Sequence, residues 1–192
     1  GAFPDQGVDP IFVAGQLIVA LQSIVSRSTP PTETAVVSIT QIHGGDAYNV
    51  IPATAKLAGT VRTLSMAVMS RVEAQMKQVV DGVCAAHGAI AEIDFRIIFH
   101  PVVNDVTASE LAAVVCDELV GEENVYRSGK PGTGSEDFSY MAEVVPGCYL
   151  NLGNGSDSHP LHNHDYDFDD GALVYGASFF ARLVERTLSD ES

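Results

Sequence analysis

Basic residues are scarce in this sequence. Ten lysines and arginines stand against 25 aspartates and glutamates, which gives a formal net charge of -15. Nucleic acids and anionic membranes both require a basic face on their partner, so this balance argues against either one. Tryptophan is absent, and no uninterrupted apolar run is long enough to predict a transmembrane helix. The chain starts Gly-Ala-Phe-Pro without a basic leader, so no signal peptide is predicted.

Cysteine is also rare. The three residues Cys84, Cys116 and Cys148 are far apart, odd in number and in no CxxC spacing. This pattern excludes a disulfide framework or a zinc knuckle and is typical of small core residues in a reducing cytoplasm. The remaining composition, 46% hydrophobic over 192 residues, indicates a globular protein with ample length for a core.

The first hundred residues predict helices and strands in alternation. Caps, stop signals and hydrophobic periodicity define them. They are a helix from Asp9-Pro10 to about Arg27, strands at 35–42 and 55–62, a helix from Ser65 to Gly88, and a strand at 91–99. One more strand before residue 1 would complete a split βαββαβ sandwich with an antiparallel sheet.

A change of composition at Pro101 marks a candidate domain boundary. Beyond it, a capping box predicts a helix, and a Gly-rich turn leads into a second one. The predicted elements are a helix from Thr107, strands at 125–126 and 148–152, a helix capped by Ser135, and a last helix from about Asp169. The sequence therefore predicts a two-domain protein of mixed α and β structure.

The segment 158–170, SHPLHNHDYDFDD, is the best candidate for chemistry. It holds His159, His162 and His164 together with four aspartates. Neutral imidazole and carboxylate are common ligands of zinc and other transition metals. The alternative is a solvated surface loop that happens to be rich in histidine, and the composition of the loop does not decide between the two.

Five short motifs occur in an order and spacing that resemble one protein family. They are Gly1-Ala-Phe-Pro4 with Val8-Asp-Pro10, Gly44-Gly45-x3-Asn49-Val-Ile-Pro52, Gly59-Thr-Val-Arg62, Gly134-Ser-Glu-Asp-Phe138 with Pro146-Gly147, and Leu161-His162-Asn with Tyr166-x-Phe168. Together they are similar to the amidohydrolase branch of the aminoacylase/carboxypeptidase metallopeptidase superfamily, which includes hippurate hydrolases and auxin-conjugate hydrolases.

The resemblance implies a catalytic domain with an inserted βαββαβ, ferredoxin-like lid domain that forms a homodimer. Residues 1–102 would be the lid, without its first strand, and 103–192 the C-terminal part of the α/β catalytic domain. The implied activity is hydrolysis of the amide bond of N-acyl amino acids. The implied cofactors are two divalent metal ions per subunit, zinc, manganese, nickel or cobalt.

The same resemblance assigns roles to four residues. His162 matches the last metal ligand of the family, and Asn49 and Arg62 match lid residues that reach the substrate. Glu136 would lie beside the metal cleft. Taken from the residues alone, Arg62 is a solvated strand residue, Asn49 a turn residue, and Glu136 an acid favoured at a helix N-terminus. His159 and His164 have no counterpart in the family.

One departure from the family is large. Its N-terminal catalytic segment has no match here, and that segment carries a Cys-x-His pair, a Glu-Glu pair with the general base, and a further ligand histidine. The catalytic histidine of the lid is also unmatched. We therefore expect no catalytic residue in this chain, weak or no metal binding by it alone, and no activity. The competing interpretation is a non-catalytic dimerisation or binding module.

Overall fold

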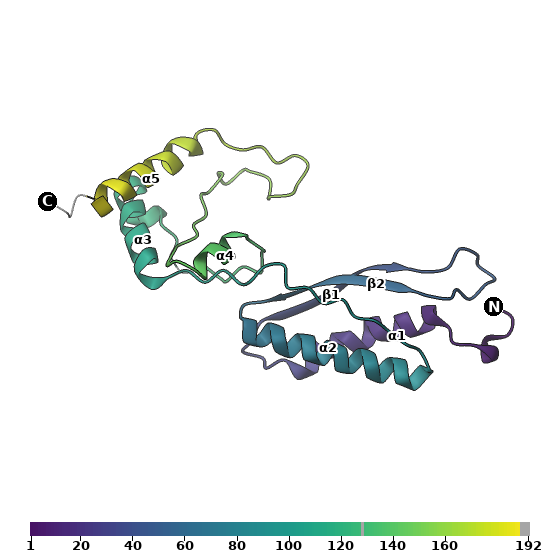
Figure 1. The fold of residues 1–192 in the computed structure, drawn as a ribbon. Coiled ribbons are helices and arrows are strands. Elements are labelled where there is room, and N and C mark those ends of the chain that lie inside the picture. The colour runs from purple at the N-terminus through teal and green to yellow at the C-terminus, as the bar shows by residue number, and fades with distance from the viewer. Residues whose placement is uncertain (128, 189–192) are drawn as a thin grey trace. The chain divides into compact units, whose positions relative to one another are not determined.

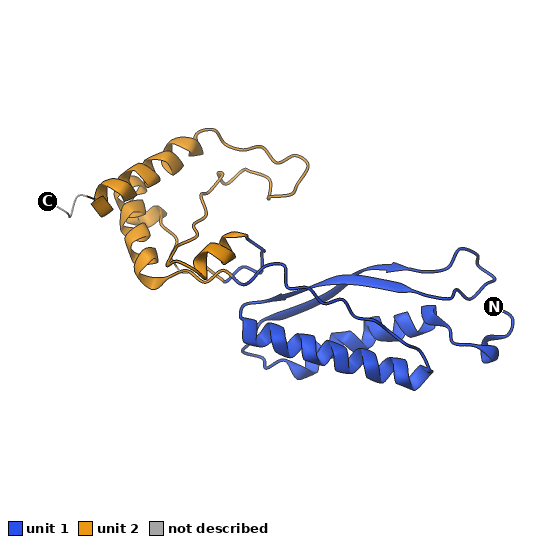
Figure 2. Ribbon diagram, viewed as in Figure 1, with its two compact units in different colours: residues 1–101, 131–136 blue, residues 102–130, 137–192 orange. Residues whose placement is uncertain are grey.

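The computed structural model describes residues 1–127 and 129–188 and shows a mixed α/β protein (Figure 1). It divides into two compact units (Figure 2). The first consists of Gly1–Pro101 and Pro131–Glu136, and the second of Val102–Lys130 and Asp137–Ser192. The return of 131–136 to the first unit was not predicted. The assignment of lid and catalytic domain to the chain stays a prediction.

The first unit opens with a short 3-10 turn, η1 (Pro4–Gln6), and then helix α1 (Pro10–Ser23). The Asp9 carboxylate accepts the N–H groups of Ile11 and Phe12 at 2.9 and 3.2 Å, so the predicted N-cap is confirmed. A π-helical segment, η2 (Ile24–Ser28), prolongs the helix by five residues.

One helix of the described chain is long and apolar enough to cross a membrane by length and composition alone, although no uninterrupted apolar run predicted it. It is Pro10–Ser28, with a mean hydropathy of 1.4. Gln16 and Gln22 interrupt the apolar run, but the mean hydropathy of the segment stays high. Core helices pass the same test, and the buried side chains of this one do lie in the core of the first unit: Val13, Leu17, Leu21 and Ile24.

Strands β1 (Ala35–His43) and β2 (Lys56–Thr63) form an antiparallel hairpin. The register runs from Ala35 opposite Thr63 to His43 opposite Lys56, with an irregularity between Ile39 and Gln41. Gly59 lies opposite this bulge, where a Cβ atom would come within 2.1 Å of the Ser38 carbonyl oxygen. A glycine within a strand commonly marks such a close backbone approach.

Helix α2 (Met66–His87) follows the hairpin and confirms both predicted ends. The Ser65 hydroxyl accepts the N–H of Val68 at 3.3 Å, and Gly88 ends the helix with φ 68°. Both α1 and α2 cover one face of the hairpin (Figure 1). The hydrophobic core between them consists of Val13, Leu17, Leu21, Ile24, Ala35, Val37, Val68, Val72, Val80 and Cys84, and Thr63 of β2 is also buried.

The strand predicted at 91–99 is not present among the described residues. Ile93 does pack against the core, as the alternation of side chains requires. However, the sheet consists of β1 and β2, and the segment is hydrogen-bonded to neither as a strand. A strand exists only as part of a hydrogen-bonded ladder, so a pattern of side chains alone is not sufficient to form one.

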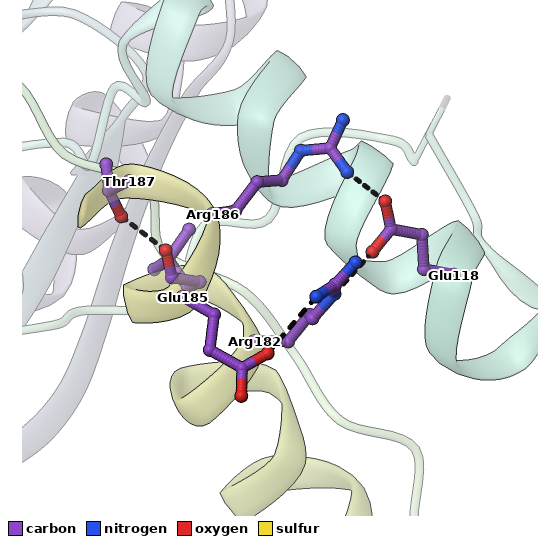
Figure 3. A network of polar contacts seen from close by, with 6 residues as sticks. Glu118, Arg182, Glu185, Arg186 and Thr187 are labelled. Carbon is purple, nitrogen blue, oxygen red and sulfur yellow. Dashed lines mark hydrogen bonds and ion pairs between the residues drawn. The ribbon is translucent and has the colours of Figure 1, made fainter. Parts of the chain in front are cut away.

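The second unit is built on helices α3 (Val106–Val120) and α5 (Ala172–Leu188), which are in contact. Short elements η3 (Glu122–Asn124) and α4 (Phe138–Ala142) lie between them in the chain. On α3, Glu118 accepts hydrogen bonds from Arg182 and Arg186 of α5 (Figure 3).

The N-terminus of α3 differs from the prediction. Asp105 caps the helix by accepting the N–H of Ala108 at 2.8 Å, so Thr107 lies within the first turn. The aspartate lies two positions before the predicted cap and offers a charged acceptor to the free amides.

The strands predicted at 125–126 and 148–152 are absent from the described part of the second unit. In place of a strand pair, the Asn104 amide group bridges to Tyr149. It donates to the Tyr149 carbonyl at 2.9 Å and accepts its N–H at 2.8 Å. The side chain thus satisfies the backbone groups that a neighbouring strand would otherwise satisfy.

Candidate metal and substrate sites

His162 lies in a long loop before α5, at the third position of the first of two tight turns. The N–H of Asn163 donates to the Pro160 carbonyl, and the N–H of Tyr166 donates to the Asn163 carbonyl, each at 3.1 Å. The Asn163 side chain accepts the N–H of Asp165 at 2.9 Å. The backbone of the loop is therefore ordered around His162, whose side chain is exposed.

The backbone of His162 is in the left-handed region, with φ 68°. It is the only non-glycine residue with positive φ in the described part of the chain. Left-handed backbone disfavours a residue with a Cβ atom and persists where the surrounding structure enforces it. Such positions cluster at functional sites, and this one distinguishes His162 from the other loop histidines.

The two neighbouring histidines have ordinary surface surroundings. His164 lies 3.2 Å from the Asp165 carboxylate, with 88% of its side chain exposed. His159 is also exposed. These contacts support the interpretation of both as solvated loop residues.

The donor set of this chain does not by itself fit a metal ion. Among the described residues, no three histidine, cysteine, aspartate or glutamate side chains come together as a metal site. A catalytic zinc requires about three protein ligands besides water. His162 can supply one imidazole, and the other ligands would have to come from outside the described residues.

The cysteines do not add to this site. All three are free, and Cys84 is buried in the core of the first unit. Burial, and next the nearby Asp81 carboxylate, raises the pKa of the Cys84 thiol. Burial is also the main cause of the raised pKa of Cys116. Raised pKa values disfavour the thiolate, the form that binds metals and attacks substrates.

Arg62 lies near the end of β2 and reaches the segment 131–136 of the same unit. Its guanidinium donates to the Ser135 hydroxyl and, at 3.4 Å, to the Thr133 carbonyl. Ser135 is therefore not the helix cap that was predicted, because α4 begins at Phe138 with Asp137 as its N-cap. The structure thus brings Arg62 beside the segment that contains Glu136, which is half-buried.

Asn49 lies in the loop that joins β1 and β2, in an exposed turn. The loop borders an open hollow of about 490 Å³, lined in part by Asp46, Tyr48 and Val50. Arg62 lies at the opposite end of the hairpin, opposite Val36. At about 3.3 Å per strand residue, the strand from Lys56 to Arg62 spans roughly 20 Å, and Asn49 lies in the loop beyond Lys56.

The sequence matches one family along almost the whole chain. The family model described as Peptidase family M20/M25/M40 matches residues 9–186, and the chain belongs to that family. It is a family of metal-dependent amidohydrolases and peptidases.

Three of the relatives with curated descriptions are amidohydrolases. A hippurate hydrolase of Campylobacter jejuni is 36% identical over 188 residues, 98% of this chain and 49% of the relative. An N-acetylcysteine deacetylase of Bacillus subtilis is 36% identical over 94% of this chain and 47% of its own length. An IAA-amino acid hydrolase of Arabidopsis thaliana is 30% identical over the full chain and 44% of its own length. The chain spans about half the length of the curated relatives that it matches.

Two solved structures share the fold. A Bacillus subtilis protein described as a dinuclear metal-binding peptidase of the M20 family matches with a TM-score of 0.77 and 33% identity, over 95% of this chain and 47% of the other. A putative aminohydrolase of Staphylococcus aureus matches with a TM-score of 0.82 and 26% identity, over 96% and 47% of the two chains.

Proposed function

We propose that the chain is part of a metal-dependent enzyme that hydrolyses the amide bond of N-acyl amino acids such as hippurate. Water adds across the C–N bond and yields a carboxylic acid and a free amino acid. The observation that carries this proposal is the match to amidohydrolases over nearly the whole chain, together with the backbone of His162. Metal ions in hydrolases activate water and polarise carbonyl groups.

Three side chains have roles in this proposal. His162 contributes one imidazole to the metal site. Arg62 binds the carboxylate of the amino acid, because its planar fork of donors matches a carboxylate in two hydrogen bonds. Asn49 offers an amide donor to the substrate carbonyl. Glu136 lies in the segment next to Arg62 and would line the pocket.

We further propose that the protein is a homodimer through its first unit. The strand from Lys56 to Arg62 alone spans roughly 20 Å, and Asn49 lies in the loop beyond Lys56. This separation favours a site in which Arg62 and Asn49 come from two copies of the chain. Sedimentation equilibrium should give twice the monomer mass, and a monomer that keeps full activity would contradict the proposal.

The proposed cellular location is the cytoplasm. Three free cysteines, one of them buried in the core, are consistent with a reducing compartment. The proposed partners are limited to a small substrate and a second copy, without nucleic acid or membrane, as the charge of -15 favours.

The test compares two histidine variants in the protein at its full natural length. His162→Ala should remove most hydrolysis of hippurate and N-acetyl amino acids and lower the bound zinc, manganese, nickel or cobalt. His164→Ala is the matched control, since it removes an exposed imidazole two positions away. Near-normal turnover by His162→Ala would exclude the metal role of this residue.

A second candidate function follows from the missing ligands. The described residues hold no complete metal site, which favours a non-catalytic dimerisation or binding module for the chain alone. Metal analysis of the purified 192-residue chain separates the two interpretations of this polypeptide. No bound metal and no hydrolysis would support an inactive portion, whereas two tightly bound ions per chain would exclude it.

A further inference from the structure

Asn154 joins the two ends of the loop that contains His162. Its side-chain oxygen accepts the N–H of Asp169 at 2.7 Å. Its amide nitrogen donates to the Asp167 carbonyl and to the Ser158 hydroxyl, each also at 2.7 Å. The partners lie 15, 13 and 4 positions along the chain, so one side chain holds both the entry and the exit of the loop.

The loop depends on these hydrogen bonds because few other contacts fix its conformation. Residues 155–168 contain no helix or strand, and nearly all of them are exposed. Fixing an exposed segment of this length costs conformational entropy at every residue. The turns around Asn163 order the centre of the loop, and the three hydrogen bonds of Asn154 order its base.

The amide group suits this position in a way that a carboxylate does not. Asn154 uses both N–H donors and its oxygen at the same time, and it is half-buried. An aspartate could accept from Asp169 but has no hydrogen to donate to Asp167 or Ser158. Its negative charge would instead face the backbone carbonyl oxygen of Asp167, which is also a hydrogen-bond acceptor.

We propose that Asn154 is a positioning residue for His162: it closes the loop so that the imidazole is presented from one fixed, left-handed turn. This inference rests on the proposed function for the role of His162 as a metal ligand. The hydrogen bonds of Asn154 go to Ser158, Asp167 and Asp169, so it acts on His162 through the loop backbone. Loss of a group bonded directly to a ligand commonly lowers metal affinity by about 10- to 100-fold, and we expect a smaller effect from Asn154.

A merely structural asparagine would behave differently, and the same unit contains one. Asn104 makes a similar two-way bridge, to the N–H and carbonyl of Tyr149, but it lies outside the His162 loop. Asn104→Ala is therefore the matched control for Asn154→Ala. Both variants lose an amide bridge, and only one of them loses it at the loop.

The first measurement is hydrogen exchange by mass spectrometry on the full-length protein. In Asn154→Ala, the hydrogen-bonded amides of Asn163, Asp165 and Tyr166 should exchange at least about tenfold faster, because the base of the loop opens. Asn104→Ala should leave them unchanged, and Asn154→Asp should fall between Asn154→Ala and the parent. Unchanged exchange in Asn154→Ala would overturn the proposal.

The second measurement is metal affinity, by titration of the metal-free full-length protein with zinc. Asn154→Ala should bind zinc more weakly by up to about tenfold, the lower end of the effect of losing a direct partner of a ligand, while Asn104→Ala should not. If Asn154→Ala keeps its affinity but His162→Ala loses it, the positioning role is wrong and the proposed function stands. If His162→Ala also keeps its affinity, the metal role of His162 fails and the positioning role fails with it.

Discussion

The guanidinium of Arg62 donates a hydrogen bond to the Ser135 hydroxyl, 73 positions further along the chain. A second bond, to the Thr133 carbonyl at 3.4 Å, comes from the same nitrogen. The two contacts attach the segment 131–136 to the end of β2 within the first unit. They also fix the direction of the guanidinium, which is the group proposed to bind the substrate carboxylate.

Ser135→Ala should therefore weaken substrate binding more than it slows turnover. Without the hydroxyl, the guanidinium loses a partner that orients it before substrate arrives. We expect KM for hippurate to rise about three- to tenfold in the full-length protein, from the loss of one hydrogen bond to a charged group, with kcat nearly unchanged. Steady-state kinetics measures both constants.

Two further variants control this prediction. Ser135→Thr keeps a hydroxyl and should restore most of the parent KM. Ser70→Ala removes an exposed serine of α2 and should have no effect. A KM that stays at the parent value in Ser135→Ala, while Arg62→Ala raises it, would show that Ser135 does not orient the guanidinium.

Local signals in the sequence predicted the first unit well. Asp9, Ser65 and Gly88 each define a helix end through a contact within three or four residues, so the sequence pattern carries the information. A β-rich composition located the first strand of the hairpin, and hydrophobic alternation located the second. The match to the family confirmed the amidohydrolase resemblance.

The contacts that organise the candidate sites could not be predicted from local patterns. Arg62 and Ser135 meet across 73 positions, and Asn154 bridges 15, so neither contact has a local signature. Ser135 was predicted to be a helix cap, and Asn154 was assigned no role from the sequence. The backbone of His162 was also unforeseen, because a histidine gives no sign in the sequence that its φ is positive.

Gly59 should be among the least replaceable glycines of the first unit. A Cβ atom there would lie 2.1 Å from the Ser38 carbonyl oxygen, which is backbone and cannot rotate away. Gly59→Ala should lower the free energy of unfolding by about 1–3 kcal/mol, as overpacking commonly does. Urea unfolding of the 192-residue chain measures the change.

Gly82→Ala is the matched control, since Gly82 lies within α2 and has open space around its Cα atom. Alanine is the better helix former by about 1 kcal/mol, so this variant should be as stable as the parent or more stable. Equal stabilities for Gly59→Ala and Gly82→Ala would contradict the close approach of the strands at Gly59.

The segment 91–97 should exchange its amide hydrogens rapidly in this chain. Its side chains alternate as in a strand, but it takes no part in the described sheet. Amide groups that take no part in the hydrogen bonds of a sheet are protected from exchange only by local contacts. Hydrogen exchange followed by NMR should show slow exchange at the alternate amides within 36–42 that bond to β2, and fast exchange throughout 91–97. Equal protection of the two segments would show that 91–97 is paired in solution.

Glu118 should give the second unit a stability that depends on pH. Arg182 donates to its carboxylate at 2.7 Å, and Arg186 donates to the other oxygen (Figure 3). The hydrogen bond from Arg182 is the main cause that lowers the pKa of Glu118, and the charges of both arginines add to it. The folded protein therefore holds the ionised carboxylate more strongly than the unfolded chain does.

The sign of the effect follows from this lowered pKa. A carboxyl group with a lower pKa in the folded state stabilises the fold above its unfolded pKa of about 4.3, and the stabilisation is lost as the pH falls through the folded value. Glu118→Gln should therefore lower the Tm at pH 7, and the difference from the parent should shrink as the pH falls below about 4. Glu110→Gln, an exposed change on the same helix, is the control. Thermal unfolding of the parent and both variants at pH 7, 5 and 3.5 provides the comparison. If the Tm difference between Glu118→Gln and the parent is the same at all three pH values, the stabilising charge does not lie on Glu118.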